Sequence, residues 1–164
     1  MLGIDAWNTL KIRENAGPPI TTRRRNSVEQ TLAIVKPDAV ARRQVGRILA
    51  RIEAEEFRIR AMRLVTLSEK EAEDFYEIHR SRPFFKSLVN FMASGPIVVI
   101  ALEASEAIGR WRTLMGATDP TAAEPGTLRR EFGSTIERNA THGSDGRDTA
   151  AFELRYFFQE DGLV

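Results

Sequence analysis

The stretch Ile97-Val98-Val99-Ile100-Ala101-Leu102 is apolar at every position and follows the helix-breaking pair Gly95-Pro96. Such a run predicts a buried β-strand, and because it is apolar throughout we expect it to be central in its sheet. A second apolar run over residues 31–35 ends at Lys36-Pro37-Asp38, which predicts a strand leading into a loop. Residues 58–67 alternate between apolar side chains and arginines and predict a third strand with an irregularity.

Helices are predicted between these strands. Residues 45–57 carry apolar side chains at helical spacing, and Ser68 with Glu71 three residues later forms a capping-box pattern for a helix that runs to about residue 79. Further helices are expected from Pro83 to Gly95, from a Ser105 cap to Met115, near residues 127–132 and over residues 148–158. This order predicts an α+β sandwich in which one antiparallel sheet has helices on one face.

Composition excludes several classes of protein. The 164 residues include 24 Lys+Arg, 23 Asp+Glu, two histidines and no cysteine, with a formal net charge of +1. Without cysteine there is no disulfide framework, no thiolate nucleophile and no Cys-based metal site. The longest apolar run is far shorter than the roughly 20 residues of a membrane helix, and no secretory signal is evident. We therefore expect a single cytoplasmic domain with no membrane association.

The first 28 residues differ from the rest. They contain five basic and two acidic residues and the breaker Gly17-Pro18-Pro19, whereas the remainder holds 19 basic and 21 acidic residues. We expect residues 1–28 to be a flexible N-terminal extension and residues 29–164 to be the folded domain. The slightly acidic body gives no electrostatic footprint for nucleic acid, so nucleic acid is an unlikely partner, and an Arg-rich arm remains an alternative only for the extension.

The polar, Gly- and Pro-punctuated stretch 116–146 is the candidate functional region, because long irregular segments in small domains are usually functional. It contains His142, and Glu153 beyond it could orient the imidazole ring. Motifs that hold phosphate through a Gly-rich loop are absent, so an anion would have to be bound by side chains. The cations that could do this, each of which could equally be a solvated surface charge, are Lys36, Arg110, Arg112, Arg129, Arg130 and Arg138, with Thr118 beside them. The other histidine, His79, is expected to be an ordinary surface residue of a helix.

Residues 29–160 resemble the nucleoside diphosphate kinase family. The resemblance rests on six short motifs in the family's order, of which Asn139-Ala-Thr-His142-Gly-Ser144-Asp145 is the most specific. The others are Ala33-Ile-Val-Lys36-Pro-Asp38, Arg82-Pro-Phe84-Phe85, Ser94-Gly95-Pro96, Met115-Gly-Ala-Thr118-Asp-Pro120 and Pro125-Gly-Thr-Leu-Arg129. The resemblance implies a ferredoxin-like fold with an inserted loop before a catalytic histidine.

It also implies a ping-pong phosphotransfer from ATP or another triphosphate to nucleoside diphosphates, which would maintain nucleotide pools. His142 would attack the γ-phosphorus and become a phosphohistidine, Glu153 would hold the other ring nitrogen, and Ser144 would support Glu153. Substrate-binding positions carried over from the family are Lys36, Tyr76, Phe84, Arg112, Thr118, Arg129, Ile136 and Asn139. Mg²⁺ would be held mainly by the nucleotide phosphates and water, with no protein metal ligands.

The C-terminus stops soon after the last predicted helix, as in bacterial members of the family. The resemblance implies a homo-oligomer and leaves tetramer and hexamer both open. Two other classes stay as alternatives. One is a nucleic-acid-binding module on the same fold, and the other is a catalytically silent scaffold, against which the intact His142, Glu153 and Lys36 argue.

Overall fold

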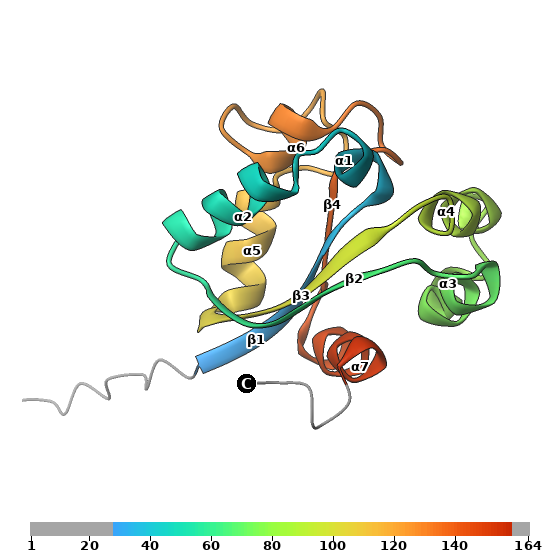
Figure 1. The fold of residues 1–164 in the computed structure, drawn as a ribbon, viewed down its shortest axis with the longest axis horizontal. Coiled ribbons are helices and arrows are strands. Elements are labelled where there is room, and N and C mark those ends of the chain that lie inside the picture. The colour runs from blue at the N-terminus through green and yellow to red at the C-terminus, as the bar shows by residue number, and fades with distance from the viewer. Residues whose placement is uncertain (1–27, 159–164) are drawn as a thin grey trace, which may run out of the picture.

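The computed structural model describes residues 28–158. It contains a four-stranded antiparallel sheet in the order β2-β3-β1-β4 (Figure 1). The strands are β1 (Val28–Val35), β2 (Arg58–Val65), β3 (Ile97–Ser105) and β4 (Thr141–Gly143). The ferredoxin-like α+β class is thereby confirmed, while the predicted N-terminal extension lies, except for Val28, outside the described residues.

The apolar run at 97–102 lies at the centre of the sheet, as predicted. β3 pairs with β1 on one side, with Thr31 opposite Leu102, and with β2 on the other. The irregularity expected in β2 is a register shift between Ile59 and Ala61. The sheet is therefore organised around the most hydrophobic segment of the chain.

Helices cover both faces of this sheet, so the expectation of helices on one face was wrong (Figure 1). One face carries α2 (Val45–Ala54), α5 (Ala107–Met115) and α6 (Leu128–Phe132), and the other carries α3 (Glu69–Phe75), α4 (Phe85–Met92) and α7 (Arg147–Phe157). The short α1 (Pro37–Ala41) follows β1 directly, and a 3₁₀ turn, η1 (Glu77–His79), follows α3.

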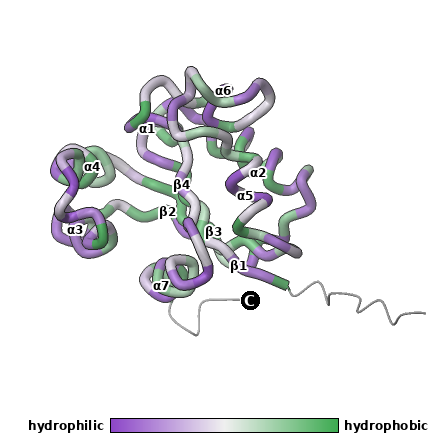
Figure 2. The backbone as a smooth tube through the Cα atoms, turned by 180° about the vertical axis from the view of Figure 1, so that it is seen from behind, coloured by the Kyte–Doolittle hydropathy of each residue, from purple (hydrophilic) through white to green (hydrophobic). Residues whose placement is uncertain are grey.

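The physical reason for two covered faces lies in β1 and β3 themselves. Ala33 and Val35 belong to the core that contains Trp111, whereas Leu32 and Ile34 belong to the core that contains Phe75. A strand that is apolar on both faces needs cover on both. Hydrophilic and hydrophobic residues follow each other along the helices, as expected when each helix has one apolar and one polar face (Figure 2). No helix within residues 28–158 is long and apolar enough to cross a membrane.

Of the two predicted helix caps at Ser68 and Ser105, the structure confirms the first and contradicts the second. The capping box at α3 is confirmed, because Glu71 N donates to Ser68 Oγ and Ser68 N donates to the Glu71 carboxylate. Ser105 does not cap α5, because β3 extends to Ser105 and pairs it with Val28. The N-cap residue of α5 is Glu106, which contributes no side-chain cap, and the distant Glu29 carboxylate accepts Ile108 N instead.

Sequence analysis did not predict β4, which contains His142. This strand has only three residues and pairs with the edge of β1, with His142 opposite Ile34. Three residues that include a glycine are too short to display a strand period, so the pairing is decided by the available edge of β1. The segment between α5 and β4, in which α6 is the only helix, is the inserted loop that the resemblance implied.

Close packing beside His142 gives a test of this arrangement. A Cβ at Gly143 would lie 2.4 Å from Cδ1 of Trp111, whereas a Cβ at Gly46 in α2 would meet nothing within 4 Å. We expect Gly143→Ala to lower the free energy of unfolding by about 1–3 kcal/mol, because overpacking forces the core to shift. Gly46→Ala is the matched control and should leave stability unchanged or raise it by up to about 1 kcal/mol. Urea denaturation measures both, and equal stability of the two variants would contradict the packing described for β4.

Candidate active site

His142 lies in the middle of β4 with its ring partly open to solvent. Its side chain is 19% exposed, and its ring meets those of Phe75 and Tyr76 edge to face at centroid distances of 5.8 and 6.0 Å. Trp111 Nε1 donates a hydrogen bond of 3.1 Å to the carbonyl of His142. Strand, indole and aromatic neighbours together fix the position of the imidazole while leaving part of it accessible.

A hydrogen-bond chain holds one nitrogen of this ring. His142 Nε2 lies 3.1 Å from Oε1 of Glu153, which comes from α7, and Ser144 Oγ donates to Glu153 Oε2 at 2.6 Å. Ser144 Oγ in turn accepts from Leu32 N on β1 at 3.2 Å. A carboxylate only accepts hydrogen bonds, so Nε2 carries the proton and the neutral ring has its lone pair on Nδ1.

Two arginines, Arg129 and Arg112, lie near each other and contact β4 or the residues that follow it. Arg129 donates to the carbonyls of Gly116 and Thr141 at 3.0 and 3.1 Å, and its buried Nε has no hydrogen-bond partner within residues 28–158. Burial and the nearby charge of Arg112 lower the pKa of Arg129 to about 10. Arg112 projects from α5 and forms an exposed ion pair with Asp145. Two cations held close together favour an anion between them.

Lys36 follows β1 and is almost fully buried. Its Nζ donates to Asn139 Oδ1 at 2.7 Å, and burial together with the charge of Arg129 lowers the pKa of Lys36 to about 8. Asn139 Nδ2 donates in turn to the carbonyls of Thr118 and Ile136 at 3.0 and 2.8 Å. These contacts join the end of β1 to both ends of the inserted loop.

Two large apolar side chains stand exposed near the loop. Phe84 and Ile136 are 51% and 61% exposed. They lie on elements that are tied together, because Ser87 of α4 hydrogen-bonds to the carboxylate of Glu137. Exposed apolar surface on two adjoining elements suits a flat ligand ring.

Tyr76 is buried, and its hydroxyl has no partner within the described part of the chain. Burial and the Glu153 carboxylate raise the pKa of Tyr76 far above its ordinary value. His79 was expected to be an ordinary surface residue, but it is partly buried and its ring stacks on Tyr76 at 6.3 Å and lies 5.9 Å from that of Phe84. Sequence reasoning missed this contact because η1 interrupts the helix predicted to run through it.

The three remaining candidate cations, Arg110, Arg130 and Arg138, contact backbone carbonyls or aromatic rings. Arg110 donates to the carbonyl of Glu55 and lies over the ring of Phe57, beside a groove of about 600 Å³ between α2 and α5. Arg130 donates to the carbonyl of Thr121 at 3.0 Å. Arg138 packs over the ring of Phe91, as Lys36 does. The structure thus brings Arg129 close to both Arg112 and Lys36, and places Lys36 and Arg138 over the same ring. Arg110 and Arg130 instead donate to the carbonyls of Glu55 and Thr121.

Comparison with known proteins decides the family. A family model described as nucleoside diphosphate kinase matches residues 29–163. The nucleoside diphosphate kinase of Syntrophotalea carbinolica is 57% identical over 131 residues, which cover 80% of this chain and 96% of that protein. The Aquifex aeolicus nucleoside diphosphate kinase superposes with a TM-score of 0.83 at 41% identity, covering 84% of this chain and all of that one. The chain belongs to the nucleoside diphosphate kinase family.

A third relative was solved with a bound nucleotide. The nucleoside diphosphate kinase of Halobacterium salinarum, solved in complex with CDP, superposes with a TM-score of 0.80 at 38% identity, over 83% of this chain and 91% of that one. As a member of this family, the chain is a phosphotransferase that moves phosphate between nucleoside tri- and diphosphates through a phosphohistidine. The family uses a divalent cation for this reaction.

The lowered pKa of Lys36 gives a direct test of the site's electrostatics. The protein has only four lysines, so the ¹³Cε signals can be followed one by one in a pH titration. We expect one signal, absent in Lys36→Arg, to titrate near pH 8, because burial disfavours the charged form. The folded protein then binds fewer protons than the unfolded chain between pH 8 and about 10.4, so this group makes stability rise with pH across that window. Four signals that all titrate above pH 10 would contradict the burial of Lys36 against Arg129.

Proposed function

We propose that His142 is the residue that carries the phosphate, and that Nδ1 is the atom that accepts it. The observation that supports this most strongly is the contact between Nε2 and Glu153, since it leaves the lone pair on the other nitrogen. Phosphoryl transfer requires chiefly a positioned nucleophile and stabilisation of charge on the transferring group. A partly open imidazole next to Arg129 provides both.

The reaction proceeds in two matched halves. Nδ1 attacks the γ-phosphorus of ATP, a P–N bond forms, and the bond from the γ-phosphorus to the bridging oxygen breaks with release of ADP. A terminal phosphate oxygen of a second nucleoside diphosphate then attacks the phosphohistidine and breaks the P–N bond. Throughout, Glu153 and Ser144 keep the ring in one orientation, and the Glu153 carboxylate stabilises the positive charge that the ring acquires.

The phosphates are bound by the side chains around His142. Arg129 offers its Nε, which has no hydrogen-bond partner within residues 28–158, and Arg112 exchanges Asp145 for a phosphate oxygen. Lys36 supplies a positive charge next to Asn139, and the ring of Tyr76 lies 6.0 Å from that of His142. The remaining contact to the β-phosphate comes from Thr118, whose carbonyl is already tied to Asn139.

The nucleoside lies further out, between Phe84 and Ile136. Stacking on these side chains uses the π-face of a base, which every base has, so the enzyme accepts all nucleobases. Asn139 hydrogen-bonds the ribose 3′-hydroxyl. In this arrangement the enzyme recognises a nucleotide mainly by its sugar and phosphates, and the base contributes little to recognition.

Mg²⁺ enters as part of the substrate, bound to the nucleotide phosphates. Within residues 28–158 no group of three or more His, Cys, Asp or Glu side chains could hold a metal ion, and the site is rich in cations. Such a site suits an ion that brings its own phosphate and water ligands. Its contribution is to neutralise charge that develops on the phosphate oxygens.

The decisive experiment is labelling with γ-³²P-ATP and Mg²⁺. We expect the protein to retain label that is lost in acid, as expected for a phosphohistidine, and His142→Ala to retain none. His79→Ala replaces the only other histidine and is the matched control, which should still take label. Label that survives the loss of His142 would contradict the proposal. So would transfer from ATP to dGDP at an unchanged rate in that variant.

We further propose a cytoplasmic homo-oligomer, a tetramer or a hexamer, in which residues 29–164 form the kinase domain and residues 1–28 an extension. Within the described residues β2 pairs with β3 alone, and its Met62 and Leu64 side chains are exposed. An exposed edge strand with apolar side chains is typical of a surface that pairs with another chain. Sedimentation should give a mass four or six times the 18.5 kDa of one chain, and a monomer would contradict this.

A further inference from the structure

Ala140, two residues before His142, has a backbone conformation that is rare for a residue with a side chain. Its φ is 66°, it is fully buried, and Thr141 N donates to Asn139 O across it at 2.7 Å. These features define a three-residue γ-turn with positive φ at its centre, a strained form. Such a conformation persists only when its surroundings hold it in place.

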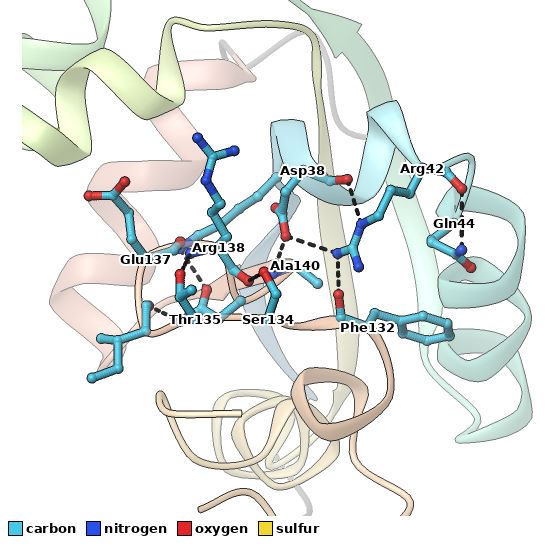
Figure 3. Close-up of polar contacts among 12 residues, drawn as sticks. Asp38, Arg42, Gln44, Phe132, Ser134, Thr135, Glu137, Arg138 and Ala140 are labelled. Carbon is cyan, nitrogen blue, oxygen red and sulfur yellow. Dashed lines mark hydrogen bonds and ion pairs between the residues drawn. The ribbon is translucent and has the colours of Figure 1, made fainter. Parts of the chain in front are cut away.

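The segment that follows β1 holds both polar groups of Ala140. Lys36 N donates to the carbonyl of Ala140 at 2.9 Å, and Asp38 Oδ2 accepts from Ala140 N at 3.3 Å. Figure 3 shows the Asp38 carboxylate directed at Ala140. The Asp38 side chain is only 6% exposed, so its charge is placed at this turn with little access to water.

Arg42 keeps Asp38 in position. Its Nη2 donates to Asp38 Oδ2 at 3.1 Å and its Nε to the carbonyl of Asp38 at 3.0 Å, and Nη2 also contacts the carbonyl of Phe132 at the end of α6 (Figure 3). A buried carboxylate needs such a partner, since an unpaired one would be costly. The Asp38–Arg42 pair therefore connects α1, the end of α6 and the turn that leads into β4.

We propose that Asp38 is a positioning residue for phosphate transfer, which it serves by holding the γ-turn at Ala140. The inference rests on the role proposed for His142. The turn sets the direction in which the chain leaves Asn139 and enters β4, so it fixes the ribose-binding amide relative to the imidazole. It also fixes the carbonyl of Thr141, to which Arg129 is bonded.

Without the carboxylate, Ala140 relaxes toward negative φ and β4 shifts against β1. Misplacement of a reacting group by about 1 Å can slow a reaction about 100-fold. The effect falls on the rate of transfer, because Lys36, Arg112 and Phe84 still bind the nucleotide. A purely structural contact would instead lower stability and leave the rate of the folded enzyme unchanged.

The test compares Asp38→Ala, Asp38→Asn and each combined with Ala140→Gly. Single-turnover labelling of the full-length enzyme with MgATP gives the rate of His142 phosphorylation, and its concentration dependence gives nucleotide affinity.

We expect Asp38→Ala to lower the rate about 10- to 100-fold with a change in affinity of less than about 3-fold. Adding Ala140→Gly should restore most of the rate, because glycine adopts positive φ without a steric penalty. Asp38→Asn keeps an acceptor oxygen, so its labelling rate should fall less, and Ala140→Gly should restore that rate as well. If Asp38→Ala does not fold, the comparison of Asp38→Asn with and without Ala140→Gly decides the outcome.

The matched control is Glu29→Ala. Glu29 makes contacts of the same kind, accepting one backbone N–H from Ile108 at 3.0 Å and one arginine, Arg147, at 3.1 Å, but it lies at the other end of β1. This variant should lower the unfolding temperature and leave the labelling rate unchanged. A wild-type rate in folded Asp38 variants, or a loss that glycine at 140 does not repair, would overturn the proposal. A wild-type enzyme that takes no label on His142 would instead overturn the proposed function.

Discussion

The hydrogen bond between His142 Nε2 and Glu153 is the interaction on which the account of this enzyme depends. In the proposed mechanism it determines which ring nitrogen has a lone pair, and so which atom accepts the phosphate. Its geometry requires three separate elements: β4 supplies the histidine, α7 the carboxylate, and Leu32 of β1 the amide that holds Ser144 against that carboxylate. The sheet order places β4 beside β1, so this three-residue strand positions the histidine next to the residues that orient its ring.

The second constraint is the accumulation of buried positive charge. Burial lowers the pKa values of Lys36 and Arg129, so both cations are less stable than they would be in water. They are held there by carbonyls and by Asn139, which contribute partial negative charge without neutralising them. In the proposed mechanism an arriving phosphate would relieve this unfavourable state, and a site organised before the substrate arrives needs no reorganisation during the reaction.

Much of the fold could be predicted from local patterns. The apolar run at 97–102, the alternation in β2 and the capping box at Ser68 were each confirmed, because they depend on neighbouring residues. Features decided by distant partners were missed. β4 exists because an edge of β1 is available, and α5 begins without Ser105 because β3 continues to pair and Glu29 supplies the acceptor.

In the candidate site, too, residue types could be predicted from the sequence, whereas contacts between distant residues could not. His142 and the cations were recognisable as residue types, yet composition and spacing could not say which of them meet, and the family motifs supplied that grouping. The structure brings Lys36 to Asn139 and Arg129 to the strand of His142, but it turns Arg110 toward Glu55. Asp38 belongs to one of the family motifs but could not be identified from sequence as a positioning residue, since its contact with Ala140 spans 102 residues and the positive φ that it supports is invisible in sequence.

The position of the phosphate on the imidazole ring tests the central claim most directly. NMR of the ¹⁵N-histidine-labelled phosphoenzyme, kept at alkaline pH, distinguishes the two ring isomers by their ³¹P–¹⁵N couplings. The hydrogen bond to Glu153 predicts a phosphate on Nδ1 alone, with a protonated Nε2. A phosphate on Nε2 would contradict the account, because that nitrogen would then have lost the carboxylate that is said to orient the ring.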